Sequence, residues 1–218
     1  MGVMRFAVYP PELLDEWPEV YRAFISGFDE RIFPTRIEVD DNVITCRRQE
    51  SESGKLNVAW PVAGVGRPIV STCSLAEREE PYLLSLELAR GKIAQLRDQA
   101  ESWKITSLKI PDEFQSLYSE ALRLFTRALS LQSQNRLEES SQSACDAVQK
   151  ACEAAALLVE AYSQQRLNVR RRRSPQLPAS LGCFLGFSNP DESRGNDHFC
   201  EAFHAAAIPV EWKCARCA

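Results

Sequence analysis

Apolar and polar residues alternate with period two in four segments of the first third of the chain, at residues 4–9, 43–46, 56–60 and 69–72. Turn residues separate these segments, including Asp40, Asp41 and Asn42 and the Ser-Glu-Ser-Gly run that ends at Gly54. Short strands with one apolar face, divided by Asx and glycine turns, are typical of an antiparallel sheet. We therefore predict a β-rich N-terminal domain over residues 1–78, built as a small sandwich or as a sheet packed on the helices that follow.

The spacing of apolar residues changes to steps of three and four from about residue 80, which indicates helices. Residues 79–169 carry three such apolar faces, so we predict a helical region whose last two helices form an antiparallel hairpin. The faces are Leu86, Ala89, Ile93, Leu96, Ala100 and Trp103; then Phe114, Tyr118, Ala121, Phe125 and Ala128; then Leu137, Ala144, Val148, Ala151, Ala155, Leu158 and Tyr162. Small residues and heptad-like spacing on the third face are compatible with a bundle within the chain or with self-association through residues 112–167.

A basic run from Arg170 to Arg173 follows the third helical pattern, and Pro175 comes shortly after it. Cations favour the C-terminal end of a helix, and proline favours an extended conformation in the residue before it. We therefore interpret residues 170–178 as a solvated linker. A nucleic-acid patch is the functional alternative, but no aromatic residues are interleaved with the arginines, so we expect no nucleic-acid binding.

Two short apolar runs lie beyond the linker, at residues 179–187 and 207–212, with a polar loop and a helical pattern around residues 199–206 between them. A strand, a helix and a strand in this order predict a βαβ unit. The predicted fold class is α+β, with a β-rich N-terminal sheet or sandwich, long antiparallel helices and a short βαβ unit over residues 179–218.

Several stretches of the sequence resemble one known family. LPASLGCFLG and FCEAFHAAAIPVEWK are similar to the entrance of the (β/α)8 barrel of family-ten glycoside hydrolases, the endo-1,4-β-xylanase family. MRFAVYPPELLDEWPEVYRAFISG, GKLNVAWPV, REEPYLLSLELARGKIAQLRDQ and QQRLNVRRRRSPQLPASLGC are similar to the N-terminal part of bacterial family-ten-like proteins, in which a β-rich and a helical region precede such a barrel. The resemblance extends to about Trp212 and implies that residues 179–218 are the start of an incomplete barrel.

The resemblance implies the accessory N-terminal portion of a glycoside hydrolase that degrades polysaccharide. Glu211 and Lys213 stand where the family's second strand reaches a sugar subsite, so they are candidate sugar contacts. The family's two catalytic glutamates lie on later barrel strands, so this chain alone is expected to have no glycosidase activity. The final residues, CARCA, depart from the family pattern, which leads to the hypothesis of a truncated or frame-shifted product.

Three aromatic residues of the β-rich region are candidates for carbohydrate binding, namely Trp17, Tyr21 and Trp60, because exposed rings stack on sugar faces. A place in the core is the alternative, since Trp60 alternates in phase with Leu56 and Val58. A polysaccharide or an oligosaccharide is accordingly the expected partner.

Soft metal ligands gather near the end of the sequence, where His198 and Cys200 precede the pair Cys214 and Cys217. These residue types suit a tetrahedral zinc site, although a strong zinc signal has two closely spaced pairs and only one is present here. The sequence has no glycine-rich phosphate loop with its lysine, so we expect no cofactor.

The composition narrows the classes of protein further. The 218 residues carry a formal charge of -4, and neither a long apolar run nor an export signal is found. We therefore expect a cytoplasmic protein that does not bind membranes and whose eight cysteines are reduced. Two functions remain: the accessory portion of a glycoside hydrolase, or a non-enzymatic helical interaction module.

Overall fold

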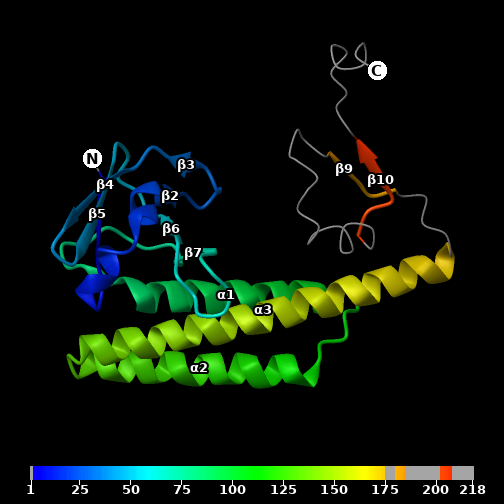
Figure 1. The fold of residues 1–218 in the computed structure, drawn as a ribbon. Coiled ribbons are helices and arrows are strands. Elements are labelled where there is room, and N and C mark those ends of the chain that lie inside the picture. The colour runs from blue at the N-terminus through cyan, green and yellow to red at the C-terminus, as the bar shows by residue number, and fades with distance from the viewer. Residues whose placement is uncertain (1, 175–179, 185–201, 208–218) are drawn as a thin grey trace, which may run out of the picture. The chain divides into compact units, whose positions relative to one another are not determined.

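The computed structural model describes residues 2–174, 180–184 and 202–207, and it has a mixed α+β architecture (Figure 1). The chain divides into two compact units, the first ending at Arg166 and the second beginning at Leu167. The predicted α+β class is thus confirmed.

One sheet of the first unit has the strand order β4-β5-β1-β8. Its strands are β1 (Gly2–Ala7), β4 (Arg36–Asp40), β5 (Val43–Arg48) and β8 (Tyr82–Leu83). The long pair β1 and β5 is antiparallel, with Gly2 opposite Arg48 and Ala7 opposite Val43. Alternate residues of these two strands are buried, as the period-two pattern predicts.

A second sheet has the order β3-β2-β6-β7, and all its neighbouring strands are antiparallel. Its strands are β2 (Phe24–Ser26), β3 (Ile32–Phe33), β6 (Lys55–Ala59) and β7 (Ile69–Ser71). Two short 3₁₀ helices, η1 (Pro11–Leu14) and η2 (Pro18–Arg22), connect β1 to β2 along the chain. The N-terminal region is therefore built from two small sheets.

Three helices follow, α1 (Leu84–Ile105), α2 (Asp112–Ser133) and α3 (Leu137–Arg173). Two serines of α3 form hydrogen bonds to α2. The Ser140 hydroxyl donates to the Ala128 carbonyl at 2.8 Å, and the Ser143 hydroxyl donates to the Leu124 carbonyl at 2.9 Å, so α3 runs antiparallel to α2. This confirms the predicted antiparallel hairpin. Among the described residues, none of these helices is both long and apolar enough to span a bilayer.

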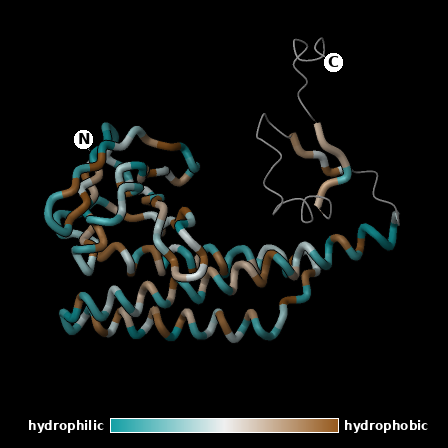
Figure 2. The backbone as a smooth tube through the Cα atoms, viewed as in Figure 1, coloured by the Kyte–Doolittle hydropathy of each residue, from teal (hydrophilic) through white to brown (hydrophobic). Residues whose placement is uncertain are grey.

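The apolar helix faces are buried within the chain. Brown, apolar positions recur along all three helices in Figure 2. A cluster formed by helices alone contains Ile93, Leu96, Ala100, Phe114, Ala121, Ala151, Ala154 and Leu158. The bundle within one chain is thus the arrangement observed. Self-association through residues 112–167 stays a prediction; Leu122 and Val159 are exposed apolar side chains in this segment.

The largest hydrophobic cluster joins both sheets to the helices. It includes Met4 and Ile44 of the first sheet, Ile25, Leu56 and Val70 of the second sheet, and Leu88, Leu124 and Val148 of the three helices. The Ser141 hydroxyl of α3 also donates to the Tyr9 carbonyl at 2.6 Å. The inner faces of the two sheets pack against the helices, so one core extends across the boundary predicted between residues 78 and 79.

The end of α3 corrects the predicted linker. The helix continues through Arg173, so Arg170 to Arg173 form its last turn. Arginine is a good helix former and its charge complements the C-terminal end of the helix, which explains why the basic run stays helical.

The second unit contains the parallel strand pair β9 (Gly182–Phe184) and β10 (Ala205–Ala207). The first lies within the predicted strand at residues 179–187. The second begins inside the predicted helix at residues 199–206, because its backbone pairs with β9 and this pairing overrides the helical preference of alanine. No barrel is present among the described residues, and the barrel fragment stays a prediction.

Candidate functional site

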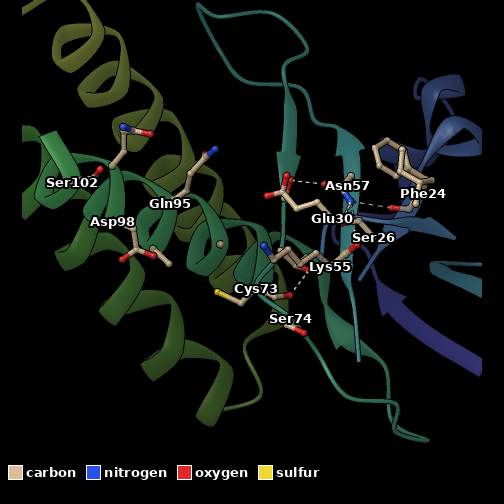
Figure 3. A pocket seen from close by; sticks show the side chains of 16 residues that line it. Phe24, Ser26, Glu30, Lys55, Asn57, Cys73, Ser74, Gln95, Asp98 and Ser102 are labelled. Atoms are coloured by element: carbon tan, nitrogen blue, oxygen red, sulfur yellow. Dashed lines mark hydrogen bonds between the residues drawn. The ribbon is translucent and has the colours of Figure 1, made fainter. Parts of the chain in front are cut away.

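An open cleft of about 650 Å³ lies between the second sheet and α1 in the first unit (Figure 3). Strands β2, β6 and β7 and the residues after β7 form one wall, and one face of α1 forms the other. The lining residues are Phe24, Ser26, Glu30, Ile32, Lys55, Asn57, Ser71, Thr72, Cys73, Ser74, Gly91, Ala94, Gln95, Asp98, Gln99 and Ser102.

Strand register brings the sheet residues of the cleft together. Asn57 on β6 lies opposite Phe24 on β2 and opposite Ser71 on β7, so the three form a row across the sheet. Ser26 and Lys55 are opposite each other in the next row. Because side chains alternate along a strand, the residues between them face the core. The outer face of this sheet is therefore the wall of the cleft.

Asn57 is the centre of a hydrogen-bond network on this wall. Its amide nitrogen donates to the Ser26 hydroxyl at 3.0 Å, and the Ser71 hydroxyl donates to its amide oxygen at 2.6 Å. The same nitrogen also donates to the Lys55 carbonyl at 3.2 Å. These bonds fix the side chain of Asn57, and they leave lone pairs of the partly exposed Ser71 hydroxyl for a ligand.

The helix wall is polar as well. Gln95, Asp98, Gln99 and Ser102 follow one another at helical spacing, so they share the face of α1 that lines the cleft. Gly91 brings the helix close to β7, since a Cβ atom at this position would lie 2.0 Å from the Ser71 carbonyl oxygen. The glycine thus sets the distance between the two walls.

Cys73 is the cysteine that lines the cleft. Burial raises the pKa of its thiol, and the positive charge of Arg90 opposes this effect. The thiol therefore stays protonated at neutral pH and is a poor nucleophile. The five cysteines of the described residues, namely Cys46, Cys73, Cys145, Cys152 and Cys183, are all free thiols.

Trp17 and Trp60 lie in the core, which is one of the two alternatives that the sequence offers, and this corrects their candidacy as sugar contacts. Each is only 1% exposed, and their rings contact each other edge to face with centroids 5.1 Å apart. The Trp17 indole nitrogen donates to the Ala59 carbonyl at 2.7 Å, which satisfies its polar group inside the core. Burial of their large apolar area is thus the role of both rings.

Tyr21 is exposed on η2, but it does not line the cleft. Its contact with sugar stays a prediction. Glu211 and Lys213 lie outside the described residues, as do His198, Cys200, Cys214 and Cys217. The part of the chain that the structure describes holds no group of three metal-ligating side chains.

Phe24, Ser26, Asn57 and Ser71 are functional candidates that the sequence pattern did not single out. Asn57 lies between the buried residues Leu56 and Val58, so the alternation did contain a signal that it faces outward. The row itself depends on the pairing of three strands, which the pattern does not specify.

Comparison with known proteins found no protein-family model, no curated protein and no solved structure that matches this chain.

Proposed function

We propose that the cleft binds carbohydrate and that the chain is a non-catalytic accessory portion of a glycoside-hydrolase-like protein. The observation that supports this most is the row of Phe24, Asn57 and Ser71 across the outer face of the second sheet. It combines one aromatic ring with fixed polar groups in an open cleft.

This combination matches the chemistry of a sugar. A sugar ring presents C–H groups on its faces and hydroxyl groups around its edge, so it stacks on an aromatic ring and exchanges hydrogen bonds with polar side chains. Asn57 is already fixed by its bonds to Ser26 and Ser71, so binding orders little more of the site. Gln95, Asp98 and Gln99 of α1 offer further hydrogen bonds from the opposite wall.

The accessory role rests on the resemblance of the sequence to the region before the barrel of family-ten glycoside hydrolases. The resemblance assigns the catalytic glutamates to later barrel strands, so the cleft supplies binding and not hydrolysis. The parallel pair β9 and β10 agrees with a βαβ unit, in which successive strands are parallel.

Calorimetric titration with xylohexaose and cellohexaose tests the proposal. Tryptophan emission is a poorer probe, because Trp17 and Trp60 are buried away from the cleft. We expect saturable binding that Asn57→Ala and Phe24→Ala each weaken by about tenfold, the loss expected for about 1.4 kcal/mol of contact energy.

Phe28→Ala is the matched control, because Phe28 is 90% exposed and lies outside the cleft. It should bind both sugars like the unmodified chain. Absence of binding to either oligosaccharide, or an equal loss in the control, would contradict the assignment of the cleft.

A further inference from the structure

We propose that the cleft selects glycans that carry carboxylate groups, that is, chains containing uronic acid residues. This inference rests on the proposed function and adds a class of ligand to it. It comes from Lys55, which projects from the outer face of β6 beside Ser26 and lines the cleft (Figure 3).

Lys55 is the cation that lines the cleft, and it has no ion-pair partner among the described residues, whereas two arginines of α1 near the cleft are paired. Arg97 pairs with Asp98 at 2.9 Å, and Arg90 pairs with Glu87 at 3.2 Å. Asp98 therefore has its own cationic partner on α1, and the ammonium group of Lys55 remains available to an incoming anion.

Glu30 is the other unpaired charge that lines the cleft among the described residues. Its carboxylate repels an anionic ligand, so it restricts where along the cleft a carboxylate is accepted. Removal of this charge should strengthen the binding of an acidic glycan, whereas removal of the Lys55 charge should weaken it. The two residues thus give opposite effects from one cleft.

The surroundings of Lys55 favour a sugar carboxylate over a phosphate. Phosphate sites typically combine arginine forks or several backbone N–H groups, and no arginine lines this cleft. A single lysine acts as a point charge, while Ser26 and Asn57 beside it suit the hydroxyl groups of a sugar. A glycan with one carboxylate per few sugar units fits this arrangement.

The test compares two probes with the same backbone, xylohexaose and a xylo-oligosaccharide that carries one glucuronic acid branch. At low salt we expect the acidic probe to bind about threefold to fivefold more tightly, which is the range of an exposed ion pair. High salt should remove this advantage, because screening acts on exposed charges.

Lys55→Gln should lose the advantage and still bind neutral xylohexaose normally, which shows that the variant is folded. Lys109→Gln changes an exposed lysine that does not line the cleft, so this variant should keep the advantage of the acidic probe. Glu30→Gln should increase the affinity advantage of the acidic probe over xylohexaose. Equal affinity of the unmodified chain for both probes would overturn the inference and leave the proposed function standing. Failure of both probes to bind would overturn both.

Discussion

The two faces of the second sheet have opposite chemistry although the same strands build them. The inner face presents Ile25, Leu56, Val58 and Val70, which are all buried in the large hydrophobic cluster. The outer face presents Phe24, Ser26, Asn57 and Ser71, which line the cleft. Neighbouring residues such as Leu56 and Asn57 therefore have separate tasks: one stabilises the fold and the next is available to a ligand.

The largest effect is expected on the inner face. Leu56→Ala removes a fully buried side chain and should lower the free energy of unfolding by about 2–5 kcal/mol. Urea denaturation measures the change. Lys55→Ala, one residue earlier and on the outer face, should be nearly neutral. Similar losses at the two positions would remove the distinction between the faces.

A substitution where α1 meets β7 should affect both stability and binding. Gly91→Ala places a Cβ atom against the Ser71 carbonyl, so the helix must move away from the sheet. We expect a loss of about 1–3 kcal/mol in unfolding free energy, together with weaker sugar binding. Gln95→Ala, on the same face of α1 but without this clash, should keep its stability. A fully stable Gly91→Ala variant would show that the walls are not held at this distance.

On the outer face, Asn57→Ala should cost only about 1 kcal/mol in unfolding free energy, because it removes hydrogen bonds and leaves the apolar core intact. Its effect on sugar affinity should be at least as large. Chemical denaturation and titration of the same preparation give both values. A loss of stability like that of Leu56→Ala would mean that the polar network belongs to the core.

The smallest effect concerns pH. Burial raises the pKa of the Glu87 carboxyl in the folded state, and the positive charge of Arg90 opposes this only in part. The folded state then binds the proton more tightly than the unfolded state, so Glu87 favours folding below its unfolded pKa and loses this contribution as pH rises through the folded pKa.

Comparison with Glu87→Gln isolates this effect. The stability of the unmodified chain relative to the variant should fall as pH rises from below the ordinary glutamate pKa into the neutral range. Thermal denaturation of both proteins over this pH range provides the measurement. A relative stability that stays constant or rises with pH would contradict the expected direction.

The sequence allowed prediction of the elements that are long enough to show a period. Residues 56–60 are predicted as a strand, and β6 is Lys55–Ala59; the helical face predicted from Phe114 to Ala128 lies within α2, Asp112–Ser133. Strands β2 and β3 were missed because they have three and two residues, too few for an alternation to be recognised. Their neighbours in the sheet, and not their own pattern, make them strands.

The site was harder to predict than the fold for the same reason. Asn57 and Ser71 are far apart in sequence, and only the pairing of β6 with β7 brings them together. The pattern also leaves the burial of Trp17 undecided, because that depends on its contact with Trp60. Sequence periodicity reports which face a residue occupies, whereas the partners across that face follow from register.

The core shared by the sheets and α3 determines which part of the chain can be transferred as one folding unit. Val148 and Cys152 of α3 belong to the same cluster as Met4 and Phe6 of β1, and the Ser141 hydroxyl donates a hydrogen bond to the Tyr9 carbonyl. A gene fragment that encodes only the sheets would lack the surface that closes them. A segment exchanged by recombination or by protein engineering should therefore extend to the end of the first unit at Arg166.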